Sequence, residues 1–105
     1  LLAEGVMVGP GKADLLEAIG ETGSIAGAGR RMGMSYKRAW MLVETMNEGF
    51  AAPLVETSRG GPGRGGAALT ETGRAVLARY RALEARAAEA AAEEIAALDR
   101  LRRGG

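Results

Sequence analysis

The stretch from Gly23 to Phe50, GSIAGAGRRMGMSYKRAWMLVETMNEGF, contains the features that decide the fold. Ser24 and Ser35 each stand just before a helical apolar pattern, where a side-chain oxygen can accept a hydrogen bond from a free backbone N–H of the first turn. Gly33 separates the two patterns, because glycine readily adopts the left-handed conformation that ends a helix. The stretch therefore predicts two short helices that run in different directions, which is a helix-turn-helix.

The second of these helices has an apolar face and a polar face. At 100° per residue, the apolar face holds Ala39, Leu42, Val43, Met46 and Phe50. The first turn presents Tyr36, Lys37 and Arg38 outward, with Met41 one turn further on the exposed side. In helix-turn-helix proteins this part of the recognition helix enters the major groove of DNA. All charged residues from 22 to 43 are basic, so we expect double-stranded DNA as the partner.

Three residues of this stretch have two interpretations each. Trp40 lies at the flank of the apolar face, where a tryptophan more often packs the helix against a sheet than contacts a base, and we expect packing. Gly27 and Gly29 each cost roughly 1 kcal/mol relative to alanine inside a helix. Close approach of the two helices would explain them, and so would chance in a chain with 17 glycines.

The composition excludes several classes of protein. The 105 residues make one small domain and contain neither cysteine nor histidine. Disulfide frameworks, Cys/His zinc sites and Ser-His or Cys-His nucleophile pairs are therefore excluded. Glu44 and Glu48 lie one turn apart on an exposed face and more simply serve solubility than acid–base catalysis. No apolar run approaches the roughly 20 residues of a membrane span. We expect a cytoplasmic binding module that is not an enzyme and has no cofactor or metal.

Two short strand patterns follow the helix-turn-helix. Residues 54–57 (LVET) and 67–70 (AALT) read as strands, and residues 58–66 between them (SRGGPGRGG) can form neither helix nor strand. Arg59 and Arg64 give this loop positive charge, and its glycines permit close approach to a groove or a phosphate. The pattern predicts a wing, and the alternative is a linker without contacts.

The last segment predicts one long helix. Thr70 is a suitable N-cap and Glu71 complements the helix dipole in the first turn. If continuous to Arg103, the helix would be roughly 50 Å long, and the body offers nothing that long to pack against. The apolar stripe that includes Ile95 and Leu98 should therefore pair with another chain or with a following domain. Of the two we favour a homodimer.

With these features in place, the chain resembles the N-terminal DNA-binding half of ModE-type molybdate-responsive regulators, which are winged helix-turn-helix proteins related to the LysR type. The resemblance rests on TGSI at 22–25, SYK at 35–37 with AW at 39–40, MN at 46–47, LVE at 54–56, the glycine-rich wing, and LT at 69–70 with Gly73. The apolar pattern from Lys12 to Glu21 predicts a further, N-terminal helix. The resemblance implies that residues 35–37 read bases, that the wing touches the adjacent minor groove or backbone, and that the N-terminal and last helices form a dimer. The oxyanion-binding effector domain of full-length members is absent from this chain.

The expected protein is mainly α with a small β-wing. A winged helix-turn-helix over residues 1–70 precedes a long dimerisation helix over 71–105. We expect a sequence-specific transcriptional regulator that binds a palindromic operator as a dimer. The alternative is a helical protein–protein adaptor without DNA binding. The residues expected to contact DNA are Ser24, Arg30, Arg31, Ser35, Tyr36, Lys37, Arg38, Met41, Arg59 and Arg64.

Overall fold

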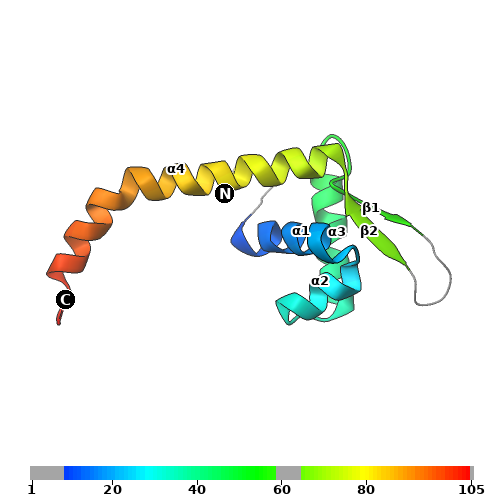
Figure 1. Ribbon diagram of the computed structural model, residues 1–105, viewed down its shortest axis with the longest axis horizontal. Coiled ribbons are helices and arrows are strands. Elements are labelled where there is room, and N and C mark those ends of the chain that lie inside the picture. Colours follow the sequence, from blue (N-terminus) through cyan, green and yellow to red (C-terminus); the bar gives the residue numbers. More distant parts are fainter. Residues whose placement is uncertain (1–8, 59–64, 105) are drawn as a thin grey trace.

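A computed structural model describes residues 9–58 and 65–104. Arg59 and Arg64 lie outside the described residues, and so do residues 2–8, whose short apolar sequence predicts a brief strand. The elements are α1 (Pro10–Thr22), α2 (Ile25–Met32), α3 (Tyr36–Gly49), β1 (Val55–Ser58), β2 (Gly66–Leu69) and α4 (Glu71–Leu101). Three helices and a two-stranded hairpin form a body from which α4 extends far to one side (Figure 1). The expected class, mainly α with a small β-wing and a long last helix, is confirmed.

Helices α2, α3 and α4 begin directly after the residues that the sequence indicates as N-caps, whereas α1 begins two residues before the predicted Lys12 and α4 ends two residues before the predicted Arg103. The side-chain oxygens of Ser24, Ser35 and Thr70 each accept a hydrogen bond from the backbone N–H three residues further on, at 2.8, 3.1 and 2.9 Å respectively. Gly23 and Gly33 end α1 and α2 with φ of 75° and 70°, in the left-handed region that glycine enters without steric cost. The caps and the helix ends are therefore encoded locally.

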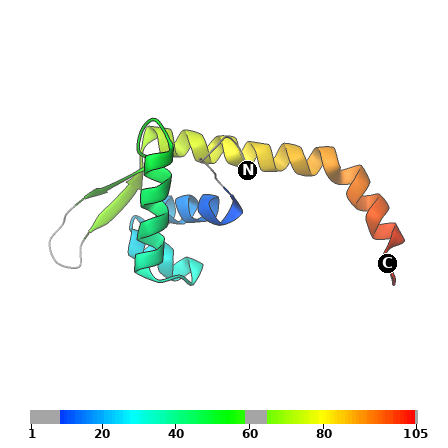
Figure 2. The same cartoon turned by 180° about the vertical axis from the view of Figure 1, so that it is seen from behind.

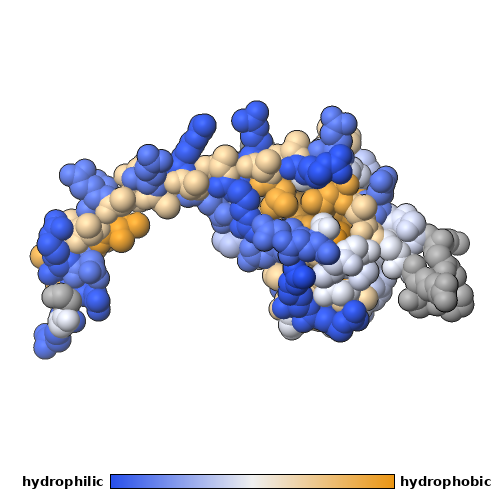
Figure 3. All heavy atoms as spheres, in the orientation of Figure 1, coloured by the Kyte–Doolittle hydropathy of each residue, from blue (hydrophilic) through white to orange (hydrophobic). Residues whose placement is uncertain are grey.

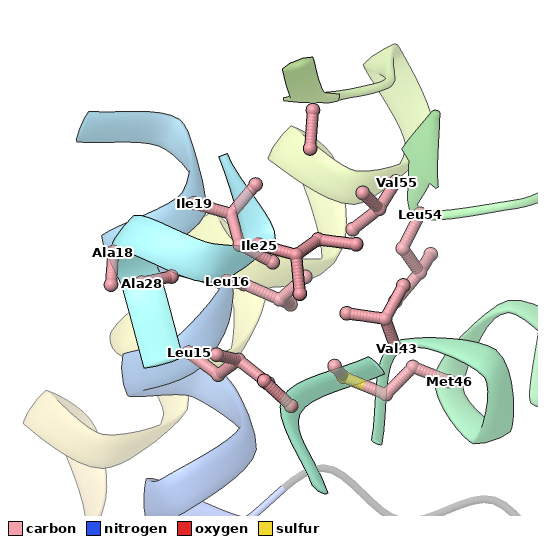
Figure 4. Close-up of a cluster of buried hydrophobic side chains, with 12 residues drawn as sticks. Leu15, Leu16, Ala18, Ile19, Ile25, Ala28, Val43, Met46, Leu54 and Val55 are labelled. Atoms are coloured by element: carbon pink, nitrogen blue, oxygen red, sulfur yellow. The ribbon is translucent and has the colours of Figure 1, made fainter. Parts of the chain in front are cut away.

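The core lies between α1, α2, α3 and β1, whose buried side chains converge in Figure 4. Its largest fully buried members are Leu15, Leu16 and Ile19 of α1 and Leu54 just before β1. Each such side chain contributes roughly 1.5–3 kcal/mol of burial. Helix α1 is thus the central packing element, and it holds the helix-turn-helix against the hairpin.

Different contacts explain why glycine stands at the two positions within α2. A Cβ at Gly29 would lie 3.3 Å from the carbonyl oxygen of Met34, in the turn that leads to α3, and 3.4 Å from the Cβ of Ala39, so glycine eases the close approach of α2 to this turn and to α3. A Cβ at Gly27 would instead lie 2.8 Å from the Oγ of Ser24, so glycine leaves room for the capping hydroxyl. Helix approach therefore explains Gly29, and the cap explains Gly27.

The hairpin is antiparallel and is attached to the helices. Val55 pairs with Leu69 and Ser58 with Gly66, so each strand extends one residue into the stretch 58–66, and the prediction that this whole stretch lacks strand structure is wrong at its two ends. The N–H of Ala67 also donates to the carbonyl oxygen of Gly23 at 2.9 Å, which ties β2 to the end of α1. The wing therefore starts from a fixed position on the body.

Helix α4 has a packed part and a projecting part. Val76, Leu77 and the buried Tyr80 pack against the body, and orange atoms gather at this junction in Figure 3. Over its 31 residues the helix spans about 47 Å at 1.5 Å per residue. The rear view shows its second half well away from the body (Figure 2). Leu98 and Leu101 there are 67% and 82% exposed.

Candidate nucleic-acid interface

The recognition helix α3 presents its first turn to solvent. Tyr36, Lys37 and Arg38 are all exposed, and the side chain of Met41 on the next turn is 56% exposed. The residues that hold the helix to the body, Ala39, Val43 and Met46, are buried. The two faces predicted from the sequence are therefore the faces that the structure has.

The two serines that we expect to contact DNA act as helix caps. Because the Oγ atoms of Ser24 and Ser35 accept bonds from backbone N–H groups, their acceptor capacity is partly used. Each hydroxyl still carries one proton that can be donated. Such a proton at the start of a helix suits an oxygen of a DNA backbone phosphate.

The two arginines of α2 differ in their surroundings. Arg31 forms an ion pair with the carboxylate of Glu21, at the end of α1, and both side chains are about half exposed. Arg30 is exposed, and no ion pair of Arg30 is found among the described residues. Glu21 lies just before the stretch in which all charged residues are basic, so the sequence interpretation missed this partner. The positive charge of Arg30 is therefore less neutralised by neighbouring described groups than that of Arg31.

The base of the wing lies beside the helix-turn-helix and forms a hollow of about 420 Å³, here called the wing hollow. One wall comes from Tyr36 and Trp40 of α3, and another from Ile25 and Ala26 of α2. The third wall belongs to the hairpin and comprises Thr57, Ser58, Gly65 and Gly66. Trp40 lines this hollow and is 38% exposed, so its side chain is largely covered but not fully buried against the sheet.

Asn47 joins the recognition helix to the wing. Its Oδ1 accepts hydrogen bonds from the N–H groups of Leu54 and Val55 at 2.8 and 3.1 Å, and its Nδ2 donates to the carbonyl oxygen of Val55 at 3.1 Å. An amide side chain can make both kinds of bond at once, as an alanine or a leucine cannot. In the sequence, Asn47 is only a polar residue near the end of a helix, and nothing there indicates this role.

Arg81 joins α4 to α1. It donates hydrogen bonds to Asp14 at 2.7 Å and Glu17 at 3.3 Å, and to Glu84 on its own helix at 3.0 Å. The bonds to Asp14 and Glu84 raise the pKa of Arg81. This cluster links α4 to α1 where α4 leaves the body, on the side away from the wing (Figure 1).

Other kinds of site find no support in the part of the chain that is described. In residues 9–58 and 65–104, no group of three or more Asp or Glu side chains could hold a metal ion. None of the helices described there is long and apolar enough to cross a membrane.

The two short helices, the wing and the exposed basic first turn of α3 define a winged helix-turn-helix domain. The sequence model of the bacterial regulatory helix-turn-helix proteins of the lysR family matches residues 12–74, which extend from α1 into the start of α4. The chain belongs to this family.

Curated relatives give a narrower placement within the family. The molybdenum-pterin-binding protein MopB of Rhodobacter capsulatus is 48% identical over 81 residues, which are 77% of this chain and 30% of MopB. The molybdenum transport protein ModE of Azotobacter vinelandii is 46% identical over 87 residues, 83% of this chain and 30% of the relative. The DNA-binding transcriptional dual regulator ModE of Escherichia coli K12 is 37% identical over 79 residues, 75% of this chain and 30% of the relative.

These matches confirm the resemblance to the N-terminal helix-turn-helix part of ModE-type regulators. The chain spans about 30% of the length of these curated relatives.

Proposed function

We propose that this chain binds duplex DNA sequence-specifically, with the first turn of α3 in the major groove and the wing against the adjoining backbone or minor groove. The observation that carries the proposal is the exposure of Tyr36, Lys37 and Arg38 on a turn that Ser35 caps, beside the wing. This geometry suits a recognition helix, because the N-terminal residues of such a helix contact base edges.

Individual residues receive different roles in this proposal. Lys37 and Met41 point away from the buried face of α3 and would face the bases. Arg30 and Arg38 would contact phosphates, and the hydroxyls of Ser24 and Ser35 would donate to backbone oxygens. Arg59 and Arg64 would also contact phosphates, and this assignment rests on the sequence alone.

Binding curves at several salt concentrations test the proposal. A site selected from random duplexes and an unselected duplex are compared by fluorescence anisotropy. Lys37→Ala should weaken the selected site by about 1–3 kcal/mol and the unselected duplex much less. Arg30→Ala should lower the slope of log K against log salt by about one unit. Arg31→Ala should lower it less, because Glu21 already neutralises part of this charge. A slope near zero in the unchanged protein contradicts DNA binding and favours the adaptor alternative.

We further propose that the protein acts as a two-fold homodimer through α4. The exposed Ile95, Leu98 and Leu101 lie beyond the reach of the body, and orange atoms reappear near this end of α4 in Figure 3. An apolar groove of about 270 Å³ near the start of α4, lined by residues that include Phe50 and Leu83, supports a second contact area. Two symmetric recognition helices would read half-sites related by a dyad, so the operator would be palindromic.

The relatives support a regulator of genes connected with molybdenum, because their names refer to molybdenum transport or molybdenum-pterin binding, and we propose that this regulator is cytoplasmic. The proposed division assigns DNA binding to residues 1–70 and dimerisation to 71–105, and the proposal includes no catalysis. Expression of molybdenum-transport genes with and without this protein tests the biological part.

A further inference from the structure

We propose that Trp40 and Tyr36 form an apolar contact for the 5-methyl groups of thymine, so that the protein requires thymine where the wing hollow faces the duplex. This inference rests on the proposed DNA binding and adds a chemical basis for sequence choice. Tyr36 and Trp40 are four residues apart and therefore lie one above the other on the same side of α3. Both line the wing hollow, and both are exposed.

The chemistry of the wing hollow favours an uncharged part of the DNA. Among its described lining residues there is no Lys, Arg, Asp or Glu. Two aromatic rings, Ile25 and Ala26 supply the apolar walls, and Thr57 and Ser58 supply hydroxyls. A phosphate would be bound more tightly by the arginines and lysine outside this hollow, because a charged oxygen gains most from a cationic donor.

The position of the two rings selects the thymine methyl among the uncharged groups. Tyr36 is the first residue of α3, next to Lys37, so its ring belongs to the turn that we place in the major groove. In that groove the bases present hydrogen-bonding groups, and the methyl group of thymine is their apolar feature. Burial of the exposed aromatic surface is therefore most favourable against the thymine methyl group. Burial against polar base edges would leave those edges without hydrogen-bond partners.

Replacing thymine by uracil in the duplex tests the inference without altering the protein. Uracil lacks only the 5-methyl group and keeps the hydrogen-bonding groups of thymine. For a duplex selected from a random pool, we expect roughly fourfold weaker binding for each contacted methyl group that is lost. The sole tryptophan provides a second measurement, because its emission should change more on binding the thymine duplex than the uracil duplex.

Variants assign the effect to the two aromatic residues. Trp40→Ala and Tyr36→Ala should bind the thymine and uracil duplexes with nearly equal affinity. Lys37→Ala should weaken both duplexes and keep their ratio. Thermal unfolding shows whether each variant is folded, and the uracil comparison on the unchanged protein needs no variant.

The outcomes separate the two proposals. If the unchanged protein binds neither duplex, the proposed DNA binding fails. If it binds both equally well, DNA binding stands and the thymine contact is overturned. If Trp40→Ala weakens both duplexes while their ratio persists, the indole contacts the sugar-phosphate backbone, and the inference is likewise overturned.

Discussion

Gly73 lies so close to Leu54 that a Cβ at position 73 would be only 2.0 Å from the carbonyl oxygen of Leu54. The same carbonyl oxygen accepts a hydrogen bond from the N–H of Thr70 at 2.9 Å. The Oγ1 of Thr70 in turn donates to the carbonyl oxygen of Pro53 at 2.6 Å. The first turn of α4 is therefore pressed against the backbone that leads into the wing.

Gly73→Ala should destabilise the fold, because the added methyl group meets backbone that cannot rotate away. We expect a loss of about 1–3 kcal/mol or more in the free energy of unfolding, measured by thermal or chemical denaturation. Gly11→Ala is the matched control in another helix, since among the described residues outside its own helix no atom lies within 4 Å of a Cβ there. The control should be neutral or gain up to about 1 kcal/mol. Equal effects of the two substitutions would contradict the close contact.

Asn47→Ala should loosen the join between α3 and β1. The change leaves the N–H groups of the buried Leu54 and Val55 without their acceptor, and each unsatisfied buried group costs about 1–3 kcal/mol. Hydrogen exchange should show faster exchange of these two N–H groups than of the N–H groups of α1. Glu48→Ala, at an exposed position beside Asn47, should change stability by less than about 0.5 kcal/mol.

The stability of the protein should decrease in alkaline solution through Tyr80. Burial, and after it the negative charge of Glu84, raises the pKa of Tyr80 above its ordinary value of about 10; Asp14 adds to the rise and Arg81 opposes it. The folded protein thus holds the phenolic proton more tightly than the unfolded chain. This contribution is present below pH 10 and is lost as the pH rises through the folded-state pKa.

The measurement for Tyr80 is the free energy of unfolding between pH 8 and about 11, for the unchanged protein and for Tyr80→Phe. The difference in the free energy of unfolding between the two proteins should stay constant at the lower end of this pH range. At the upper end the unchanged protein should lose stability relative to Tyr80→Phe. Parallel curves over the whole range would show that Tyr80 does not titrate differently on folding.

Leu98→Glu combined with Leu101→Glu should shift the proposed dimer towards monomers. Each leucine buried on association contributes roughly 1.5–3 kcal/mol, so the dissociation constant should rise by well over tenfold. Sedimentation at micromolar concentration measures the change. Glu93→Gln, at an exposed position of the same helix, is the control and should leave the association unchanged. A monomeric unchanged protein would show that this stripe serves another partner.

The sequence predicted the features that depend on neighbouring residues. A hydroxyl before an apolar pattern and a glycine after it predicted the helix boundaries, because caps act within one turn. The contacts of Asn47 and Gly73 could not be predicted, since their partners lie 7 to 8 and 19 residues away and are brought close only by packing. At the candidate interface, the basic first turn of α3 could be predicted from the sequence. The ion pair of Arg31 with Glu21 could not, because it depends on how α1 and α2 cross.

The bonds of Asn47 to β1, together with the bond from Ala67 to Gly23, hold the wing and the recognition helix in one fixed spacing. In the proposed complex, the distance between the base of the wing and α3 would therefore stay the same on a broad groove and on a narrow one. On a duplex, the deformation would therefore fall to the DNA, whose cost of bending and groove compression varies with sequence. In the proposed complex, these bonds would therefore add a second means of discrimination, which acts through DNA shape at base pairs that no side chain touches.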